Sequence, residues 1–230
     1  MGQYASLQCL QRSIMNTVRS VQPEILDGLA AGSPAACASR RDLRVINRLL
    51  GNQAWFRTVV RERCRSGEGL LEIGAGSGEL GGALHSLLPD LAGIDLAPRP
   101  KAWPQTALWF QTDVLHFSGW SSFPVVIGNL ILHHFEREHL RWIGAELGRH
   151  ARVIVASEPL RRRRTTALFA LICRLIRAHP VTRHDGRVSI DAGFCGDELP
   201  HLLGLDPQTW RWRVDETWRG ASRLVAERRT

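Results

Sequence analysis

Lysine is almost absent from this 230-residue sequence: Lys101 is the only one among the 30 Lys and Arg residues. The formal net charge is +8, and a basic chain suggests an anionic partner such as a nucleic acid. A bias toward GC-rich codons, however, would also favour arginine over lysine and enrich alanine, glycine and leucine. The positive charge alone therefore does not indicate a nucleic-acid partner.

Cysteine is scarce and scattered, and long apolar runs are missing. The five cysteines form no CxxC pair and no Cys/His cluster at zinc spacing, so neither a disulfide framework nor a metal site is predicted. No segment reaches the ~18 apolar residues of a membrane-spanning helix. We expect a cytoplasmic protein whose membrane contact, if any, is peripheral.

Apolar strands alternate with helices from Gly69 onward. Strands are predicted at 69–75, 91–96, 107–115, 125–132 and 152–158, and helices at 79–88, 136–150 and 165–178. Such a pattern indicates a parallel sheet with both faces covered. The alternating segments 209–217 and 221–227 predict a closing antiparallel hairpin. The expected fold class is α/β: a Rossmann-like, doubly wound, mostly parallel sheet with a C-terminal antiparallel hairpin and N-terminal helices.

Residues 1–66 are predicted to form an N-terminal helical cap or lid, and 67–230 the main domain. Leu7, Leu10, Ile14 and Val18 recur at helical spacing, and Pro23 is placed to open a short helix over 24–30. The segment GSPAAC (32–37) is interpreted as a break. Ser39 and Asp42 predict a capping box for a helix over 42–50, followed by a helix over 52–64.

The segment GLLEIGAGSGEL (69–80) places three glycines between a strand and a helix. Such a turn favours anions, because unpaired amides and the helix dipole point at the ligand. The spacing is G-x-G-x-G rather than the dinucleotide pattern G-x-G-x-x-G, and Glu72 and Glu79 would repel a pyrophosphate. S-adenosylmethionine fits better, because it carries a sulfonium, an ammonium and a single carboxylate.

Two further acids end the next strands. Asp95 closes the second strand about 20 residues after the glycines, where an acid can accept hydrogen bonds from ribose hydroxyls. Asp113 closes the third strand and could face the adenine edge. Each acid alone could be a turn former or loop cap, but together with the glycine turn they predict a cofactor site.

At this point the sequence resembles a known family. LLEIGAGSG, GIDL, QTDV and VVIGNLILHHF resemble successive motifs of class I S-adenosylmethionine-dependent methyltransferases over about residues 67–160. The LHH is most similar to small-molecule methyltransferases of the ubiquinone/menaquinone-biosynthesis type. Two features depart from the pattern: prolines between 97 and 104 replace a helix, and strand four lacks the acid that often opens it.

The resemblance implies S-adenosyl-L-methionine as cofactor and assigns its contacts. The methionine moiety would contact Glu72, Gly74, Gly76 and Gly78. The ribose would contact Asp95, and the adenine would contact Asp113 and Val114. Asn129 would lie near the reacting methyl group, and Ala75 and Leu96 are the remaining predicted cofactor contacts.

The resemblance also implies a small-molecule acceptor, apolar or aromatic, of a polyketide-, quinone- or lipid-like kind. An insertion at about 179–204 and the N-terminal helices would cover it, with a plain loop expected at His184 and Asp185. His133 and His134 end strand four and Glu158 ends strand five, where the crevice of a doubly wound sheet lies. Since histidine titrates near neutral pH, His133 is the first candidate base, ahead of His134 and Glu158; polar strand caps are the alternative.

Other functions stay open. The sequence has neither the [DNS]-P-P-[FYW] motif of amino-group base methylation nor a Pro-Cys nucleophile, which leaves only ribose or cap-like RNA targets for an RNA-directed methyltransferase. Intact glycines and Asp95 argue against a non-catalytic binding subunit. The run Arg161–Arg164 opposes the dipole of the helix that follows it. It is therefore a candidate contact for a phosphate, an anionic partner or a membrane surface, with a solvated loop as the alternative.

Overall fold

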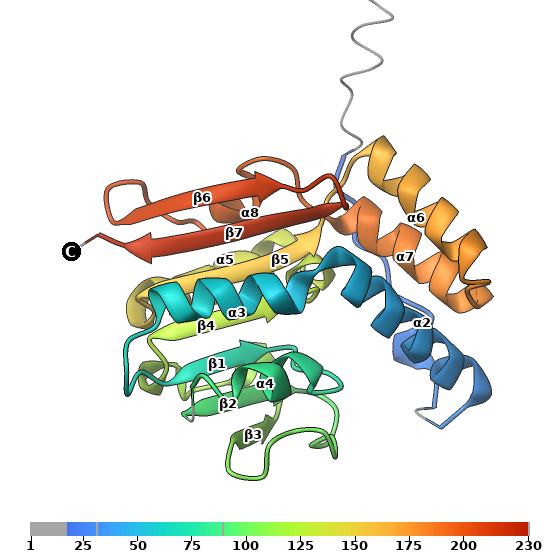
Figure 1. Cartoon of the computed structure of the whole chain (residues 1–230). Helices are drawn as coiled ribbons and strands as arrows, with labels where there is room; N and C mark the ends of the chain where they lie inside the picture. Colours follow the sequence, from blue (N-terminus) through green and yellow to red (C-terminus); the bar gives the residue numbers. More distant parts are fainter. Residues whose placement is uncertain (1–17, 31, 89, 230) are drawn as a thin grey trace, which may run out of the picture.

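The computed structural model describes residues 18–30, 32–88 and 90–229. These residues form one seven-stranded sheet in the order β3-β2-β1-β4-β5-β7-β6 (Figure 1). The strands are β1 (Leu70–Ile73), β2 (Leu91–Asp95), β3 (Leu108–Gln111), β4 (Val125–Asn129), β5 (Val153–Pro159), β6 (Trp210–Glu216) and β7 (Ala221–Arg228). The first five are parallel, whereas β7 is antiparallel to both β5 and β6. The predicted fold class is confirmed.

Helices cover both faces of the sheet because the strands carry apolar side chains on both faces. Leu70 faces a core shared with α3 (Asn52–Arg63) and α4 (Glu79–Leu84). Leu71 faces the opposite core, shared with α5 (Arg137–His150) and α8 (Glu198–Leu202). Because α3 packs on the sheet, it is part of the main domain rather than of a lid. Within the described residues, the part of the predicted cap (1–66) that could act as a lid is therefore 18–50. Within the described chain, every helix is too short or too polar to cross a membrane.

Three helices stand together beyond the carboxyl ends of β1, β4 and β5: α2 (Pro34–Leu50), α6 (Arg163–Leu175) and α7 (Pro180–Ala192) (Figure 1). Single-turn helices η1 (Leu26–Gly28), η2 (Val114–His116), η3 (Trp120–Ser122) and η4 (Leu132–His134) complete the fold. The carboxyl ends of the parallel strands are therefore partly roofed, as a ligand crevice requires.

The start of α2 differs from the prediction. The helix begins at Pro34, with the Ser33 hydroxyl accepting from the Ala36 amide at 3.3 Å, so GSPAAC is a helix start and the capping box at Ser39 and Asp42 is wrong. The helix begins here rather than at Asp42 because the Ser33 side chain caps it and the next residue is proline, whose fixed φ suits the first helical position. The short helix expected after Pro23 shrinks to η1, and the expected helix through Leu7, Leu10 and Ile14 lies outside the described residues.

Asp42 instead joins α2 to α7. Its Oδ2 accepts from the His179 amide at 2.7 Å and from the Thr182 hydroxyl at 3.1 Å, at the N-terminus of α7. An acid there is favourable because it meets unpaired amides and the positive end of the helix dipole. The residue predicted to cap its own helix therefore caps another one.

The insertion at 179–204 contains α7 and α8, so the plain loop expected at His184 and Asp185 is wrong. Gly186 has a low helix propensity and therefore hid the helix from sequence analysis. It lies where α6 and α7 pack together: a β-carbon there would lie 2.0 Å from Cζ of Phe169. Glycine thus permits the close approach of the two helices despite its low helix propensity.

Residues 96–107, all of them described, contain no helix, as the prolines predict. This segment places Trp103 against the sheet, where β-carbons on Gly81 and Gly93 would lie 2.2 and 2.7 Å from its ring. The indole Nε1 donates to the carbonyl of Leu108 at 3.1 Å. Trp103 thereby fills the space beside α4 and β2 that a covering helix would occupy.

Candidate functional site

The glycine turn after β1 has the backbone that only glycine adopts easily. Gly74, Gly76 and Gly78 have φ values of 65°, 52° and 77°, all in the left-handed region. At Gly74 the fit is also steric, since a β-carbon would lie 2.3 Å from Cγ1 of Ile131. The turn therefore contacts the segment that follows β4.

Glu72 lies buried beneath this turn, with 3% of its surface exposed. Burial raises the pKa of its carboxyl to about 8; a hydrogen bond from the Gly81 backbone only partly offsets burial, and the nearby Asp95 adds to the rise. Its Oε2 has no hydrogen-bond partner among the described residues. Such an acid is costly in the free protein, and a cationic ligand would relieve that cost.

Asp95 ties the end of β2 to the glycine turn. Its Oδ2 accepts from the Gly76 amide at 2.7 Å, and its Oδ1 accepts from the Ala97 amide at 2.8 Å. Each carboxylate oxygen keeps a free lone pair. Leu96 beside it is 72% exposed, an unusual position for leucine that leaves an apolar surface next to the carboxylate.

Asp113 caps η2, with its Oδ1 accepting from the Leu115 amide at 2.9 Å. The loop-cap role considered as the alternative for this residue is thus the one it performs in the structure. The side chain of Val114 is buried in the core, so only its backbone faces outward. An adenine contact at this strand end would use the second oxygen of Asp113 and that backbone.

Asn129 ends β4 beside a strained residue. Its Oδ1 accepts from Nδ2 of Asn52 at 2.9 Å, and Oδ1 of Asn52 in turn accepts from the Ser157 hydroxyl at 3.0 Å. The next residue, Leu130, has φ 56°, which is rare for a side chain of this size and concentrates at functional sites. Asn52, buried at the start of α3, was not predicted, because a single asparagine opening a helix carries no functional signal.

His133 and Glu158 form a buried pair at the ends of β4 and β5. Nδ1 of His133 lies 2.7 Å from Oε2 of Glu158, and the Glu158 carboxylate also accepts from the amides of Ile131, Leu132 and His133 at 3.2, 3.0 and 3.3 Å. Burial alone would lower the pKa of His133, but Glu158 and the nearby Glu24 outweigh it and raise the pKa to about 9. His133 is therefore protonated at neutral pH, which opposes its ranking as the first base.

His134 is the more accessible histidine, with 29% of its side chain exposed. Burial and the neighbouring charge of His133 lower its pKa, so its imidazole is neutral near pH 7. Its Nε2 lies 3.9 Å from Oε1 of Glu24. Burial would raise the pKa of Glu24, yet His133, His134 and Ser189 together lower it. Glu24 is a site residue that sequence reasoning missed, since it lies 109 positions before His133.

The segment 18–28 (hereafter the lid segment) crosses η4 and α7. Arg19 donates to the carbonyls of His133, Phe135 and Ala192 at 3.0, 2.8 and 2.8 Å. The buried Asp185 accepts from the amides of Ile25 and Leu26, both at 2.9 Å. The prediction that N-terminal residues and the insertion cover the site thus gains a physical basis in direct contacts between them.

No protein-family model matches the sequence, and no curated protein matches it significantly. Solved structures do resemble it. The plantazolicin methyltransferase BpumL in complex with SAH has TM-score 0.64 and 13% identity, over 86% of this chain and 92% of that chain. BamL, in complex with a triazolic desmethylPZN analog and SAH, has TM-score 0.64 and 10% identity, over 87% and 91%. The N-methyltransferase NodS from Bradyrhizobium japonicum has TM-score 0.52 and 16% identity, over 79% and 97%.

The chain has a methyltransferase fold. At these identities the likeness concerns the fold alone, and it does not single out the ubiquinone/menaquinone type. Within the methyltransferase fold, the predicted cofactor residues lie at the carboxyl ends of β1, β2, β3 and β4, and the predicted catalytic residues at those of β4 and β5.

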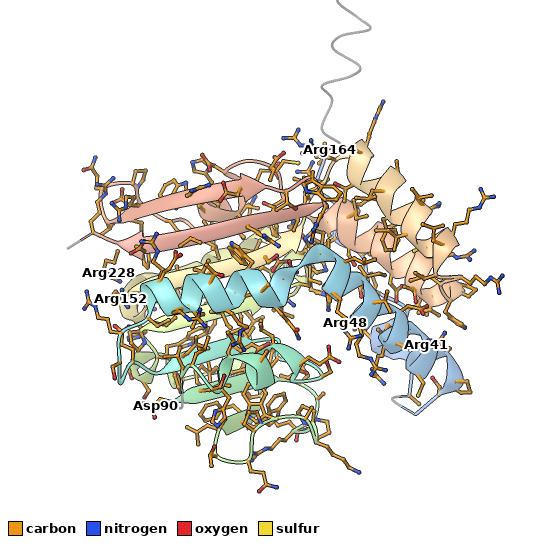
Figure 2. All side chains as sticks on the ribbon, in the orientation of Figure 1. Arg41, Arg48, Asp90, Arg152, Arg164 and Arg228 are labelled. Carbon is orange, nitrogen blue, oxygen red and sulfur yellow. The ribbon has the colours of Figure 1, made fainter. Side chains whose placement is uncertain are left out.

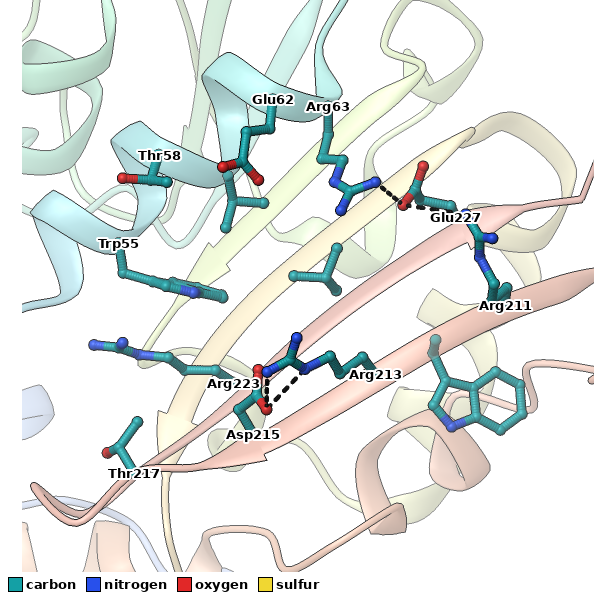
Figure 3. A pocket seen from close by; sticks show the side chains of 13 residues that line it. Trp55, Thr58, Glu62, Arg63, Arg211, Arg213, Asp215, Thr217, Arg223 and Glu227 are labelled. Atoms are coloured by element: carbon teal, nitrogen blue, oxygen red, sulfur yellow. Dashed lines mark hydrogen bonds and ion pairs between the residues drawn. The ribbon is translucent and has the colours of Figure 1, made fainter.

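A separate groove of about 690 Å³ lies between α3 and the β6–β7 hairpin (Figure 3). At its wall, Cζ of Arg223 lies 4.9 Å from the ring centroid of Trp55. Two ion pairs also line the groove, Arg213 with Asp215 and Arg63 with Glu227. None of the described residues that line it belongs to the predicted site. In this methyltransferase fold the candidate site is therefore defined by strand ends and backbone geometry, and this groove lies apart from it.

The run Arg161–Arg164 is not a free cationic patch. Arg161 is buried and its guanidinium contacts both oxygens of Glu198, the second at 2.6 Å. Arg162 and Arg164 reach Glu216 at 2.7 and 3.7 Å. The run is therefore not a plain solvated loop, and an anionic or membrane contact is not supported, because Glu198 and Glu216 offset two of its four positive charges.

Other arginines are dispersed. The labelled ones lie on α2, at the start of α6 and at the opposite end of the sheet (Figure 2). Arg152 pairs with Glu68 at 2.7 Å, and Arg228 donates to backbone carbonyls. Part of the positive charge of the described residues is thus paired within the chain, and the labelled arginines lie on separate parts of the molecule.

Proposed function

We propose that this protein transfers a methyl group from S-adenosyl-L-methionine to a small-molecule acceptor. The observation that carries the proposal is Glu72: a buried acid, its pKa raised to about 8, under a glycine turn at the end of the first strand. A dinucleotide would bring a pyrophosphate toward this acid, whereas S-adenosylmethionine brings an ammonium and a sulfonium. The likeness to methyltransferases with bound SAH supports the same choice.

The residues present fit this cofactor. Glu72 and the amides of the glycine turn would hold the methionine moiety, and the free lone pairs of Asp95 would accept from the ribose hydroxyls. Leu96, exposed beside Asp95, and the outer oxygen of Asp113 would border the adenine. When bound, the cofactor supplies a methyl group already activated by its sulfonium.

The acceptor would reach this methyl group from the side of η4, α7 and the lid segment. Direct contacts between these three elements support that direction, because they enclose the carboxyl ends of β4 and β5. The similar solved structures carry the descriptions plantazolicin methyltransferase and N-methyltransferase, and we propose for this chain a small apolar or aromatic acceptor.

The protein must then align the acceptor and, for a hydroxyl, provide a path for its proton. Glu158 acts as a positioning residue, since its oxygens are engaged by three amides and by His133. His133 is held rigidly by that pair. His134, neutral and partly exposed, is the member of the predicted set that an acceptor can reach most directly.

We expect His134→Gln to lower turnover by about 10²–10⁴-fold if proton removal limits the reaction, with cofactor affinity unchanged. His150→Gln is the matched control, because His150 also lies near a carboxylate, 3.8 Å from Glu146, but on α5. Single-turnover rates and calorimetric affinities separate the two effects. Full turnover in the His134 variant would leave alignment alone as the protein's contribution.

The cofactor proposal is tested by calorimetry with S-adenosylmethionine, SAH and NADH. We expect both sulfur ligands to bind and NADH not to bind. Asp95→Ala should weaken S-adenosylmethionine by about 1.5–3 kcal/mol for each charge-assisted hydrogen bond lost. Binding of NADH without S-adenosylmethionine would overturn the proposal.

The acceptor is sought with a deuterated methyl donor. Host extracts incubated with the protein and methyl-deuterated S-adenosylmethionine should yield a labelled metabolite by mass spectrometry, absent with the Asp95 variant. A label confined to RNA would replace the small-molecule acceptor by the RNA alternative.

A further inference from the structure

We propose that Glu24, His133 and His134 bind a divalent transition-metal ion, with zinc as the reference ion. Each side chain offers one ligand atom, and the three atoms lie within 4.8 Å of one another. Two imidazoles and a carboxylate form a ligand set found in zinc sites that keep a further position open.

The spacing of the ligand atoms is close to that of a loaded site. Oε1 of Glu24 lies 3.8 Å from Nε2 of His133 and 3.9 Å from Nε2 of His134. Ligands at zinc–nitrogen and zinc–oxygen distances, arranged tetrahedrally, are separated by about 3.3 Å. These two separations would have to contract by about half an ångström, which is within the reach of the Glu24 side chain. The two imidazole ligand atoms, which lie within 4.8 Å of each other, would have to turn toward each other.

One ligand atom is buried without a hydrogen bond. Nε2 of His133 finds no partner within hydrogen-bond distance among the described residues, and its residue is only 3% exposed. Such an orphaned nitrogen is costly, and it points toward Glu24 and His134. A metal ion at the centre of the three atoms would satisfy it by replacing the proton on this nitrogen, which binding would release.

The ligands also carry the outer partners typical of metal sites. Nδ1 of His133 is held by Glu158 at 2.7 Å, an arrangement that fixes the ring and raises ligand basicity. Oε1 of Glu24 accepts from the Ser189 hydroxyl, and Nδ1 of His134 lies 3.9 Å from Oδ2 of Asp27. The three ligand side chains are thus held in place by the neighbouring residues Glu158, Ser189 and Asp27.

The proposed site differs from the expectation of no metal site, which rested on the lack of Cys/His spacing motifs. Two adjacent histidines and a glutamate 109 residues away give no such motif, and only the fold brings them together. A bound ion would clamp the lid segment to η4. An imidazole that binds the ion through Nε2 cannot also accept a proton there, so ion binding and a base role of His134 exclude each other. The inference rests on ligand positions and is measured without cofactor or acceptor.

The test uses the full chain without an affinity tag, stripped with a chelator and dialysed against zinc. Elemental analysis should find a single ion per chain, and cobalt in its place should give the visible absorption of a low-coordinate site. Glu24→Gln and His134→Gln should each weaken zinc binding at least tenfold, measured by competition with a chromophoric chelator. Zinc should raise the melting temperature of the wild type but not of these variants.

His150→Gln is the matched control, since His150 lies at the same 3.8 Å from a carboxylate, that of Glu146, but without a second histidine. It should keep full zinc affinity. Glu24→Gln is isosteric and retains an oxygen for Ser189, so circular dichroism should show it folded. Substoichiometric zinc in the wild type, unchanged affinity in both ligand variants, or loss of affinity in the control would each overturn the proposal.

Discussion

Replacing Glu72 with Gln is expected to stabilise the free protein and to weaken its binding of S-adenosylmethionine. The wild-type carboxyl is buried, and the only hydrogen bond it accepts among the described residues comes from the Gly81 backbone. Glutamine keeps the shape and that acceptor while removing the ionisable group. Losing a charge-assisted contact to the ligand's ammonium should cost about 1.5–3 kcal/mol of binding free energy.

The stabilisation should depend on pH in a defined direction. The folded pKa is about 8, above the ordinary value of 4.5, so the folded protein holds a proton that the unfolded chain releases between these values. Wild-type stability therefore falls as pH rises from about 4.5 to 8. At pH 8 the free energy of unfolding of the Glu72→Gln variant should exceed that of the wild type by several kcal/mol, since each unit of pKa difference corresponds to about 1.4 kcal/mol.

Denaturant unfolding at pH 5, 7 and 8 measures this slope, and calorimetry measures the affinity. Glu79→Gln is the matched control: the other acid beside the turn keeps 36% of its side chain exposed, so its replacement removes no buried carboxyl and should not stabilise the protein as Glu72→Gln does. A Glu72 variant less stable than the wild type at pH 8 would identify the acid as a structural residue instead.

Gly74→Ala is expected to damage both stability and cofactor binding far more than Gly76→Ala. Both positions have positive φ, which costs alanine about 1–2 kcal/mol. At Gly74 the new methyl would also lie 2.3 Å from Ile131, whereas at Gly76 the nearest atom is 3.9 Å away. Overpacking typically adds about 1–3 kcal/mol, so the Gly74 variant should lose roughly 3 kcal/mol in total.

The same clash should move Ile131, and with it η4, away from the glycine turn. The Gly74 variant should therefore lose affinity for S-adenosylmethionine, while the Gly76 variant keeps a folded structure and a smaller defect. Thermal unfolding and calorimetry on the pair provide the comparison. Equal losses at the two positions would show that backbone strain alone, and not contact with Ile131, sets the requirement for glycine.

The sheet and the cofactor half of the site were predictable because their signals are local. The strands read as short apolar runs, the glycine turn follows one of them directly, and Asp95 and Asp113 close the next two. Parallel strands bring their carboxyl ends to one edge whatever the details of packing. The positions of Glu72, Gly74 and Asp95 therefore followed from spacing alone.

The rest depends on contacts between distant residues. Asn52 reaches Asn129 across 77 positions, Glu24 reaches His133 across 109, and neither has a local motif. Asp42 did have one, but its partner is the start of α7 and not its own helix. The raised pKa that opposes the rank of His133 as a base has a related cause, since the carboxylates that raise it lie on β5 and the lid segment.

The contacts of the lid segment and α2 also determine when these parts of the molecule can form. Arg19, Ile25 and Asp42 bind partners up to 173 positions further along the chain, so during synthesis these contacts cannot form until α7 has emerged. Closing such large loops is entropically costly and slow. The first described residues of the chain should thus be among the last to become ordered, and the first to open in the folded protein, which would admit a ligand to the strand ends while the sheet stays intact.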